Sequence, residues 1–166
     1  VAPAGMHASI DQRRAQVLPV IEDLLGRTPE ERRAWFAAAW DAYNAFRAGR
    51  PYERGGSVRE YIASLPAGER GKLAAMSNRV NFFTMVDERD SAQAVEKGLT
   101  APVSGSHTLF INDRLNWTGV ETQVLVDLFY PDVPEIKKPL LGRESLVSID
   151  RARALIGFEP EFTFGM

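Results

Sequence analysis

The chain has 166 residues, of which 45% are hydrophobic and 25% charged, and its formal net charge is −2. This balance is typical of a soluble globular domain; it excludes a collagen-like or low-complexity chain and offers no basic surface for nucleic acid. Because no cysteine occurs, disulfides and thiolate sites are also excluded. No signal-like start and no apolar run of about 20 residues is present, so we expect a cytoplasmic protein with no membrane partner.

Helix signals dominate residues 1–78, which we expect to form a mainly helical segment. The capping-box pattern Ser9–Gln12 predicts the start of a helix that reaches Gly26. Proline removes a backbone donor, and Pro19 is therefore expected to kink or divide this helix.

The next helix has the strongest start signal in the chain. Thr28–Glu31 combines a capping residue, a proline at the first helical position and acidic residues at the positive end of the helix dipole. The helix should run to Ala48 and end at a left-handed Gly49. A further capping box at Ser57–Glu60 predicts a short third helix. Aromatic residues recur every three or four positions on the second helix, which favours a core or interface face over a surface that stacks a base or sugar: Phe36, Trp40, Tyr43 and Phe46.

In residues 79–166 the pattern changes to short apolar runs that alternate with helical segments. Val80–Val86, His107–Ile111 and Ser145–Ile149 are rich in branched or aromatic residues, and each predicts a short strand. Strands that alternate with helices indicate α/β packing. The expected fold class is therefore α/β, with a helical first half.

Three helices are predicted in this second half. Asp87 caps the first, a capping box at Thr118–Glu121 starts the second, and Asp150 caps the third, which Gly157 closes. Helical spacing assigns the inner face of the first of them to Ala92, Val95 and Leu99.

Several motifs for catalysis and cofactor binding are missing from the sequence. It contains no G-x-G-x-x-G, no Tyr-x-x-x-Lys, no G-x-S-x-G and no H-E-x-x-H. No metal site is therefore expected. Asp87 and Asp90 could form an acid/base pair, although their places at a helix start favour capping. Lys137-Lys138 and Arg143 could hold an anionic substrate or form a solvated basic edge.

Two stretches of the chain resemble the extended short-chain dehydrogenase/reductases, also called NAD-dependent epimerase/dehydratases. Val86–Val95 is similar to that family's V-D-x-x-D-x-A-x-A segment, and Ser148–Pro160 is similar to its closing motif, D-x-x-K-A-x-x-L-L-G-(W/F)-x-P. His107–Asn112 is similar to the family's F-N-I strand. With Phe129–Pro134 and Gly142–Leu146, the resemblance covers about 80–164.

The resemblance implies that the chain is the substrate-binding, C-terminal part of a Rossmann-type enzyme of this family. The substrate would be a sugar or a small carbonyl or hydroxyl compound. NAD or NADP would bind to a half outside this chain, and the catalytic Tyr-x-x-x-Lys would precede Val1. No catalytic or cofactor-binding residue is therefore expected here, and the chain alone should be inactive. In the family, strands such as Val80–Val86 and His107–Ile111 complete or flank the sheet of the cofactor-binding half.

The candidate substrate-binding residues are His7, Phe83, Lys138 and Arg143. Family members that act on nucleotide sugars are expected to carry an arginine near Phe83, and an Arg-Pro pair where Lys138-Pro139 stands. Phenylalanine cannot bind phosphate, and lysine is a point charge without the fork of arginine. Both departures favour a smaller or less anionic substrate.

Two other interpretations remain open. The chain could be a non-catalytic interaction module that pairs with itself or another protein through the aromatic face Trp35–Phe46. It could also be a small hydrolase, which would depend on His7 and His107.

Overall fold

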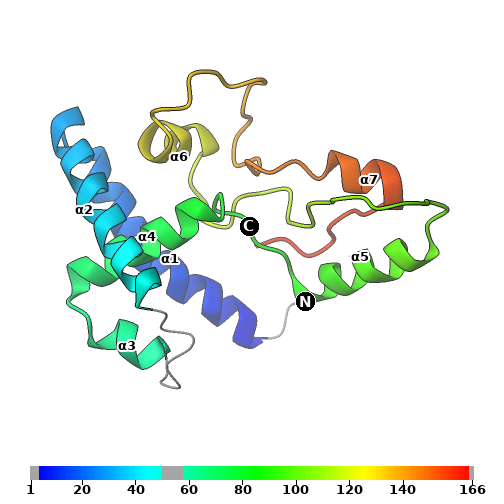
Figure 1. Ribbon diagram of the computed structural model, residues 1–166, viewed down its shortest axis with the longest axis horizontal. Coiled ribbons are helices and arrows are strands. Elements are labelled where there is room, and N and C mark those ends of the chain that lie inside the picture. Colours follow the sequence, from blue (N-terminus) through cyan, green and yellow to red (C-terminus); the bar gives the residue numbers. More distant parts are fainter. Residues whose placement is uncertain (1–3, 50–57, 165–166) are drawn as a thin grey trace. The chain divides into compact units, whose positions relative to one another are not determined.

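The computed structural model describes residues 4–49 and 58–164. Side chains are described for residues 10–49 and 60–164. These residues form seven helices and no strand, and one isolated antiparallel bridge joins Leu115 to Glu144 (Figure 1). The expected α/β fold class is therefore wrong for this chain: its described part is helical, with long irregular connections. No helix within these ranges is long and apolar enough to cross a membrane.

The chain divides into two compact units. One comprises Asp11–Asn81, and the other comprises Val1–Ile10 and Phe82–Met166. The helices are α1 (Ala4–Leu25), α2 (Pro29–Ala48), α3 (Val58–Ser64), α4 (Ala67–Val80), α5 (Glu88–Thr100), α6 (Thr122–Phe129) and α7 (Asp150–Ile156). We call the unit of Asp11–Asn81 the helical unit and the other the C-terminal unit.

Helix α1 shows where packing outweighs local signals. It begins at Ala4, so the predicted start at Ser9–Gln12 is wrong, and it continues through Pro19. A proline inside a helix costs about 3 kcal/mol. Val17, Ile21 and Leu24 are buried on one face of α1, and burying such a side chain contributes about 1.5–3 kcal/mol. Their combined burial exceeds the cost of the proline, which explains the continuous helix.

Helix α2 begins as its sequence predicts. Thr28 Oγ1 accepts a hydrogen bond from Glu31 N at 3.3 Å, and Glu31 Oε2 accepts one from Thr28 N at 2.8 Å, which completes the capping box. The end of the helix differs in detail. Gly49 has φ −67°, in the right-handed region, so the predicted left-handed stop is wrong. The predicted box at Ser57 lies outside the described residues.

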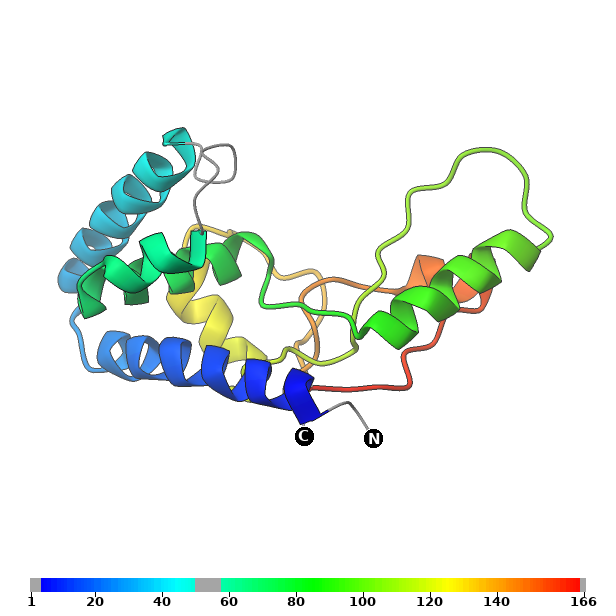
Figure 2. The ribbon, with the colours of Figure 1, turned by 90° about the horizontal axis from the view of Figure 1, so that it is seen from below.

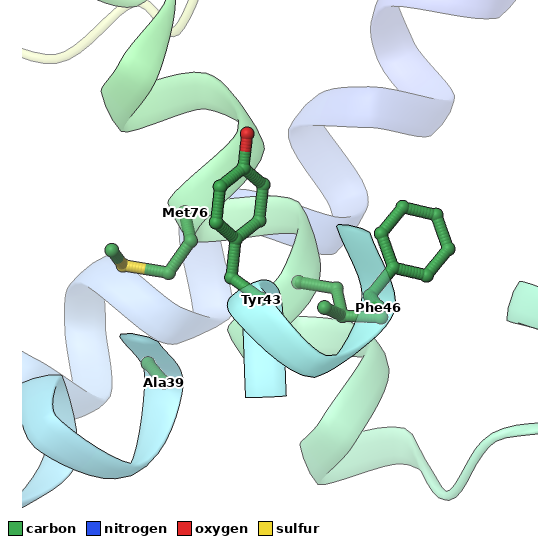
Figure 3. Close-up of a cluster of buried hydrophobic side chains, with 5 residues drawn as sticks. Ala39, Tyr43, Phe46 and Met76 are labelled. Carbon is green, nitrogen blue, oxygen red and sulfur yellow. The ribbon is translucent and has the colours of Figure 1, made fainter. Parts of the chain in front are cut away.

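The aromatic face of α2 forms the core of the helical unit together with α4. Tyr43 and Phe46 are buried with Ala39, and Leu73 and Met76 of α4 pack against them (Figure 3). The prediction of a core face is confirmed. Other aromatic residues of α2 are partly buried on the same cluster: Trp35, Phe36 and Trp40.

The predicted strand Val80–Val86 is replaced by the end of α4 and a turn. Phe82 and Phe83 both have positive φ, 55° and 53°, a region that costs non-glycine residues about 1–3 kcal/mol each. The Phe83 ring is fully buried and packs edge-to-face on Phe129, with ring centroids 4.9 Å apart. Burial of this ring offsets part of the backbone strain, while Phe82 beside it is exposed.

The other two predicted strands are also wrong. Ser145–Ile149 is irregular, and the Ser145 hydroxyl accepts hydrogen bonds from Val147 N and from Asn112 Nδ2, both at 3.2 Å. His107–Ile111 is non-helical and joins no ladder (Figure 1). A strand is stable only beside a neighbour, and the described residues supply none for this segment.

The inner face of α5 also differs from the prediction. Ala92, Val95 and Leu99 are exposed, and Asp90 and Ala94 are the buried positions. The buried side carries a small cluster in which Ala94 packs with Ile149, Ala152 and Phe158, against which Leu109 and Ile111 are partly buried. Amphipathic spacing correctly predicts the helix, yet its most apolar face has no cover in the described residues.

We expect Met76→Ala to lower the free energy of unfolding by about 2–5 kcal/mol, because it removes a fully buried side chain at the centre of the α2–α4 cluster. Val95→Ala removes an exposed side chain and should change it by about 0.5 kcal/mol or less. Urea unfolding followed by far-ultraviolet circular dichroism measures both. Equal effects of the two substitutions would contradict this description of the core.

Candidate functional site

A cleft with a volume of about 400 Å³ opens in the C-terminal unit. Its walls come from residues 113–115, the segment 138–150 and α7. Among the described residues that line it, basic and acidic side chains are equal in number: Arg114, Lys138 and Arg153, with Asp113, Glu144 and Asp150. Apolar side chains, including Leu115 and Leu141, line the rest.

The basic side chains of the cleft are held in ion pairs. Lys138 Nζ donates to Glu144 Oε1, and this hydrogen bond raises the pKa of Lys138. Arg153 Nε and Nη2 donate to the two carboxylate oxygens of Glu159 at 2.6 and 3.2 Å. Arg153 Nη1 also donates to Asp150 Oδ1 at 3.0 Å, and Arg114 Nη1 lies 3.5 Å from Glu159 Oε1.

Asp113 is buried beneath the cleft and serves as a structural anchor. Its Oδ1 accepts a hydrogen bond from Leu115 N at 3.2 Å, and its Oδ2 accepts one from Phe164 N at 2.9 Å. Asp113 N donates to Met85 O at 2.7 Å. Both carboxylate oxygens are therefore engaged by backbone donors.

Asn116 fixes the loop that carries Glu144. Its Nδ2 donates to Val120 O at 2.9 Å and to Thr122 Oγ1 at 3.0 Å, and its backbone N donates to Arg143 O at 2.8 Å. Thr122 Oγ1 in turn donates to Glu144 O at 2.6 Å. Asn116 and Thr122 are both fully buried, so this network joins the two walls of the cleft without access to solvent.

The predicted capping box at Thr118–Glu121 is wrong, because Thr118 belongs to this same network. Its hydroxyl donates to Asn116 Oδ1 at 2.6 Å and accepts from Val120 N at 3.1 Å. Helix α6 begins four residues later, at Thr122, without a side-chain cap. A threonine before Gly119, with φ 85°, forms a local turn as readily as a helix start.

The paired aspartates at the start of α5 have separate structural roles. Asp87 caps the helix as predicted, since its Oδ1 accepts from Arg89 N at 2.9 Å. Asp90 does not cap it. Its two carboxylate oxygens accept from Glu161 N and Phe162 N at 3.0 and 3.1 Å, which anchors the C-terminal segment. The Arg89 guanidinium lies 3.4 Å from the centroid of the Phe162 ring and pairs with Asp87.

The predicted site residues do not converge. Lys138 lines the cleft. Arg143 contributes its backbone carbonyl to the Asn116 network, but it does not line the cleft. Phe83 is buried against Phe129 and does not line the cleft. The side chain of His7 lies outside the described residues.

Sequence reasoning missed the residues that build the cleft. Asn112, Asp113, Asn116 and Thr122 are buried polar residues in or beside a loop, and each accepts or donates several hydrogen bonds. The signal that could have found them is the sequence Asn-Asp-Arg-Leu-Asn-Trp-Thr, because polar residues this dense between apolar ones indicate a buried polar network.

The cleft brings paired charges and apolar side chains together, and no nucleophile–base pair is described in it. His107, whose side chain is described, places Nε2 2.8 Å from Ser104 O, and Ser145 Oγ is engaged by Asn112. The arrangement pairs neither residue as nucleophile and base. In the part of the chain that the structure describes, no group of three or more His, Asp or Glu side chains could hold a metal ion. Comparisons with protein-family models, with curated protein sequences and with solved structures found no match for this chain.

We expect Asp90→Asn to lower the free energy of unfolding of the C-terminal unit by about 1–3 kcal/mol, because an amide cannot accept from both Glu161 N and Phe162 N. Glu88→Gln, an exposed change in the same helical turn, should have an effect of about 0.5 kcal/mol or less. Urea unfolding compares the two variants. An Asp90→Asn protein as stable as the Glu88→Gln protein would contradict the anchoring role.

The Arg153 guanidinium lowers the pKa of Glu159 below its ordinary value of 4.5 through their hydrogen bonds. A lowered carboxyl pKa stabilises the fold above the unfolded value, and this stability is lost as the pH falls through the folded value. An NMR titration should place the pKa of Glu159 below 4.5, and Arg153→Gln should raise it. An unchanged pKa in the variant would contradict the pairing.

Proposed function

We propose that this chain is the substrate-binding part of an NAD(P)-dependent oxidoreductase similar to the epimerase/dehydratases. Its substrate would be a sugar or a small carbonyl or hydroxyl compound, bound in the cleft of the C-terminal unit. The cofactor-binding half would be supplied from outside these 166 residues. The proposal depends on the sequence resemblance, and two features of the C-terminal unit support it.

The first feature is that the two resembling stretches pack together although about fifty residues separate them. Helices α5 and α7 contact each other, and both figures show them at the same end of the C-terminal unit (Figures 1 and 2). Lys97 Nζ donates to Gly157 O at 2.5 Å, and Gln93 Oε1 accepts from Glu159 N at 3.2 Å. Together with the hydrogen bonds of Asp90, these contacts hold the two resembling stretches against each other.

The second supporting feature is the main chain of Thr108–Ile111. Within the described residues, no hydrogen bond engages its N–H or C=O groups. Its side chains alternate: Leu109 and Ile111 pack on the Ala94–Phe158 cluster, and Phe110 between them is 61% exposed. A segment with one packed face and free backbone groups is suited to pairing with the open edge of another sheet.

The outer face of α5 adds exposed apolar surface that a partner could bury. Val95 is 64% exposed and Leu99 is 83% exposed. Complete burial of such a side chain contributes about 1.5–3 kcal/mol, so a partner that covers this face would gain appreciable binding energy. Together with the free backbone of Thr108–Ile111, this face supports a partner with a sheet.

The residues present do not fit a dinucleotide. A pyrophosphate is usually held by a glycine-rich turn between a strand and a helix. The sequence has no such glycine pattern, and the described residues contain no strand. In this proposal the chain binds and orients the substrate, and the hydride chemistry belongs to the partner.

The aromatic face Trp35–Phe46 gives little support to the alternative of an interaction module. Tyr43 and Phe46, at its C-terminal end, are buried within the helical unit (Figure 3). A partner could reach only the partly buried rings nearer the start of the helix. We therefore do not propose dimerisation through this face.

Calorimetric titration with NAD and with NADP should show no saturable binding to the isolated chain, because its sequence lacks a pyrophosphate-binding turn. Saturable binding of either dinucleotide would contradict the proposed division of labour. The same titration on an unrelated NAD-dependent dehydrogenase verifies the reagents.

The partner should be encoded upstream, with a glycine-rich βαβ unit and a Tyr-x-x-x-Lys. We expect this polypeptide to co-purify with the chain when both are expressed, and Phe110→Glu to prevent co-purification because it places a charge in the pairing face. Leu25→Glu, at a residue 51% exposed in the helical unit, is the matched control and should leave the complex intact. A complex that tolerates Phe110→Glu, or an upstream sequence without these motifs, would refute the proposal.

A further inference from the structure

The charges of the cleft indicate which substrates it can accept. We propose that the cleft selects an uncharged, hydroxyl-bearing compound over its phosphorylated form, and that Glu144 determines this selectivity by occupying Lys138. The inference builds on the proposed function, since it names the chemical class of the substrate for the same cleft.

Hydrogen bonds to the backbone of Glu144 hold this residue in position. Glu144 N donates to Leu141 O at 3.0 Å, Glu144 O accepts from the buried Thr122 hydroxyl, and the isolated bridge joins Glu144 to Leu115. The Glu144 side chain is 33% exposed, whereas that of Lys138 is 57% exposed. The carboxylate is therefore the fixed partner of the pair, and the lysine reaches toward it from an exposed segment.

The hydrogen-bond donors of Arg153 are also occupied. Its Nε, Nη1 and Nη2 atoms all donate to carboxylates, two of them to Glu159 and one to Asp150. A guanidinium binds a phosphate well when its planar fork is free to donate two parallel hydrogen bonds. The Arg153 fork is occupied by Glu159, so an incoming phosphate would have to displace a carboxylate.

An anion would also meet the acidic members of the pairs. Carboxylates only accept hydrogen bonds, so Glu144 and Asp150 cannot bind phosphate oxygens and repel them. A hydroxyl group both donates and accepts, and it can bridge a carboxylate and the ammonium or guanidinium beside it without breaking the pair. Specificity of this kind comes from repulsion of the wrong ligand.

The test is an NMR titration of the full chain with inorganic phosphate. We expect no saturable shift of the cleft amides in the native protein. Glu144→Gln leaves Lys138 unpaired, and phosphate should then bind on the order of tenfold more tightly. Glu96→Gln makes the same change in net charge at an exposed position outside the cleft and should behave like the native protein.

The double variant Lys138→Gln with Glu144→Gln should lose the gained phosphate binding, because the freed ammonium is gone. Persistence of the gain in the double variant, or native phosphate binding as tight as that of Glu144→Gln, would overturn the role of Glu144. The double variant also serves as a check on folding, since its amide spectrum should match that of the native protein outside the cleft.

A second titration compares glucose with glucose 1-phosphate on the native chain. Glucose should shift the cleft amides more than glucose 1-phosphate does. A larger response to the phosphate ester, or no response to glucose, would overturn the assignment to uncharged hydroxyl compounds. Neither titration involves the cofactor-binding half, so these outcomes are distinct from those of the co-purification experiment.

Discussion

The need of each backbone N–H and C=O group for a hydrogen-bond partner governs this structure. In the helical unit, helices meet that need internally. The C-terminal unit has long irregular segments, whose backbone groups bond to buried side chains in place of a neighbouring strand. Asn112, Asp113 and Asn116 provide these hydrogen bonds in one stretch, and Asp90 provides them for the C-terminal segment. Thr108–Ile111 is one described segment whose backbone groups have no protein partner, although Leu109 and Ile111 are partly buried on a hydrophobic cluster.

The same buried network links architecture to the cleft. Asn116 and Thr122 hold the backbone of Arg143 and Glu144 in place, and Glu144 then holds Lys138. The cleft therefore presents an ion pair whose acidic member, Glu144, is held in position by buried side chains. Such an arrangement can bind and orient a small polar molecule.

Sequence reasoning succeeded for three signals whose partners are close in sequence, but it failed for others of that kind: the boxes at Ser9–Gln12 and Thr118–Glu121 and the Asp150 cap do not form. The Thr28–Glu31 box, the Asp87 cap and the left-handed Gly157 all depend on residues a few positions apart, and all three are confirmed. It also failed where a distant partner decides the outcome. The run Val80–Val86 predicts burial correctly for Phe83, but burial does not require a ladder. The spacing of Val95 and Leu99 indicates an apolar face without saying what covers it. Of the three candidate site residues whose side chains the structure describes, only Lys138 lines the cleft.

Hydrogen exchange at the amides of Thr108–Ile111 tests the central claim most directly, because it reports whether these backbone groups are bonded within the isolated chain. The account predicts exchange close to that of an unstructured peptide, while amides in α5 and α6 on either side are protected. Protection of Leu109 and Phe110 equal to that of the neighbouring helices would show that the segment already has its partner, and would contradict the account.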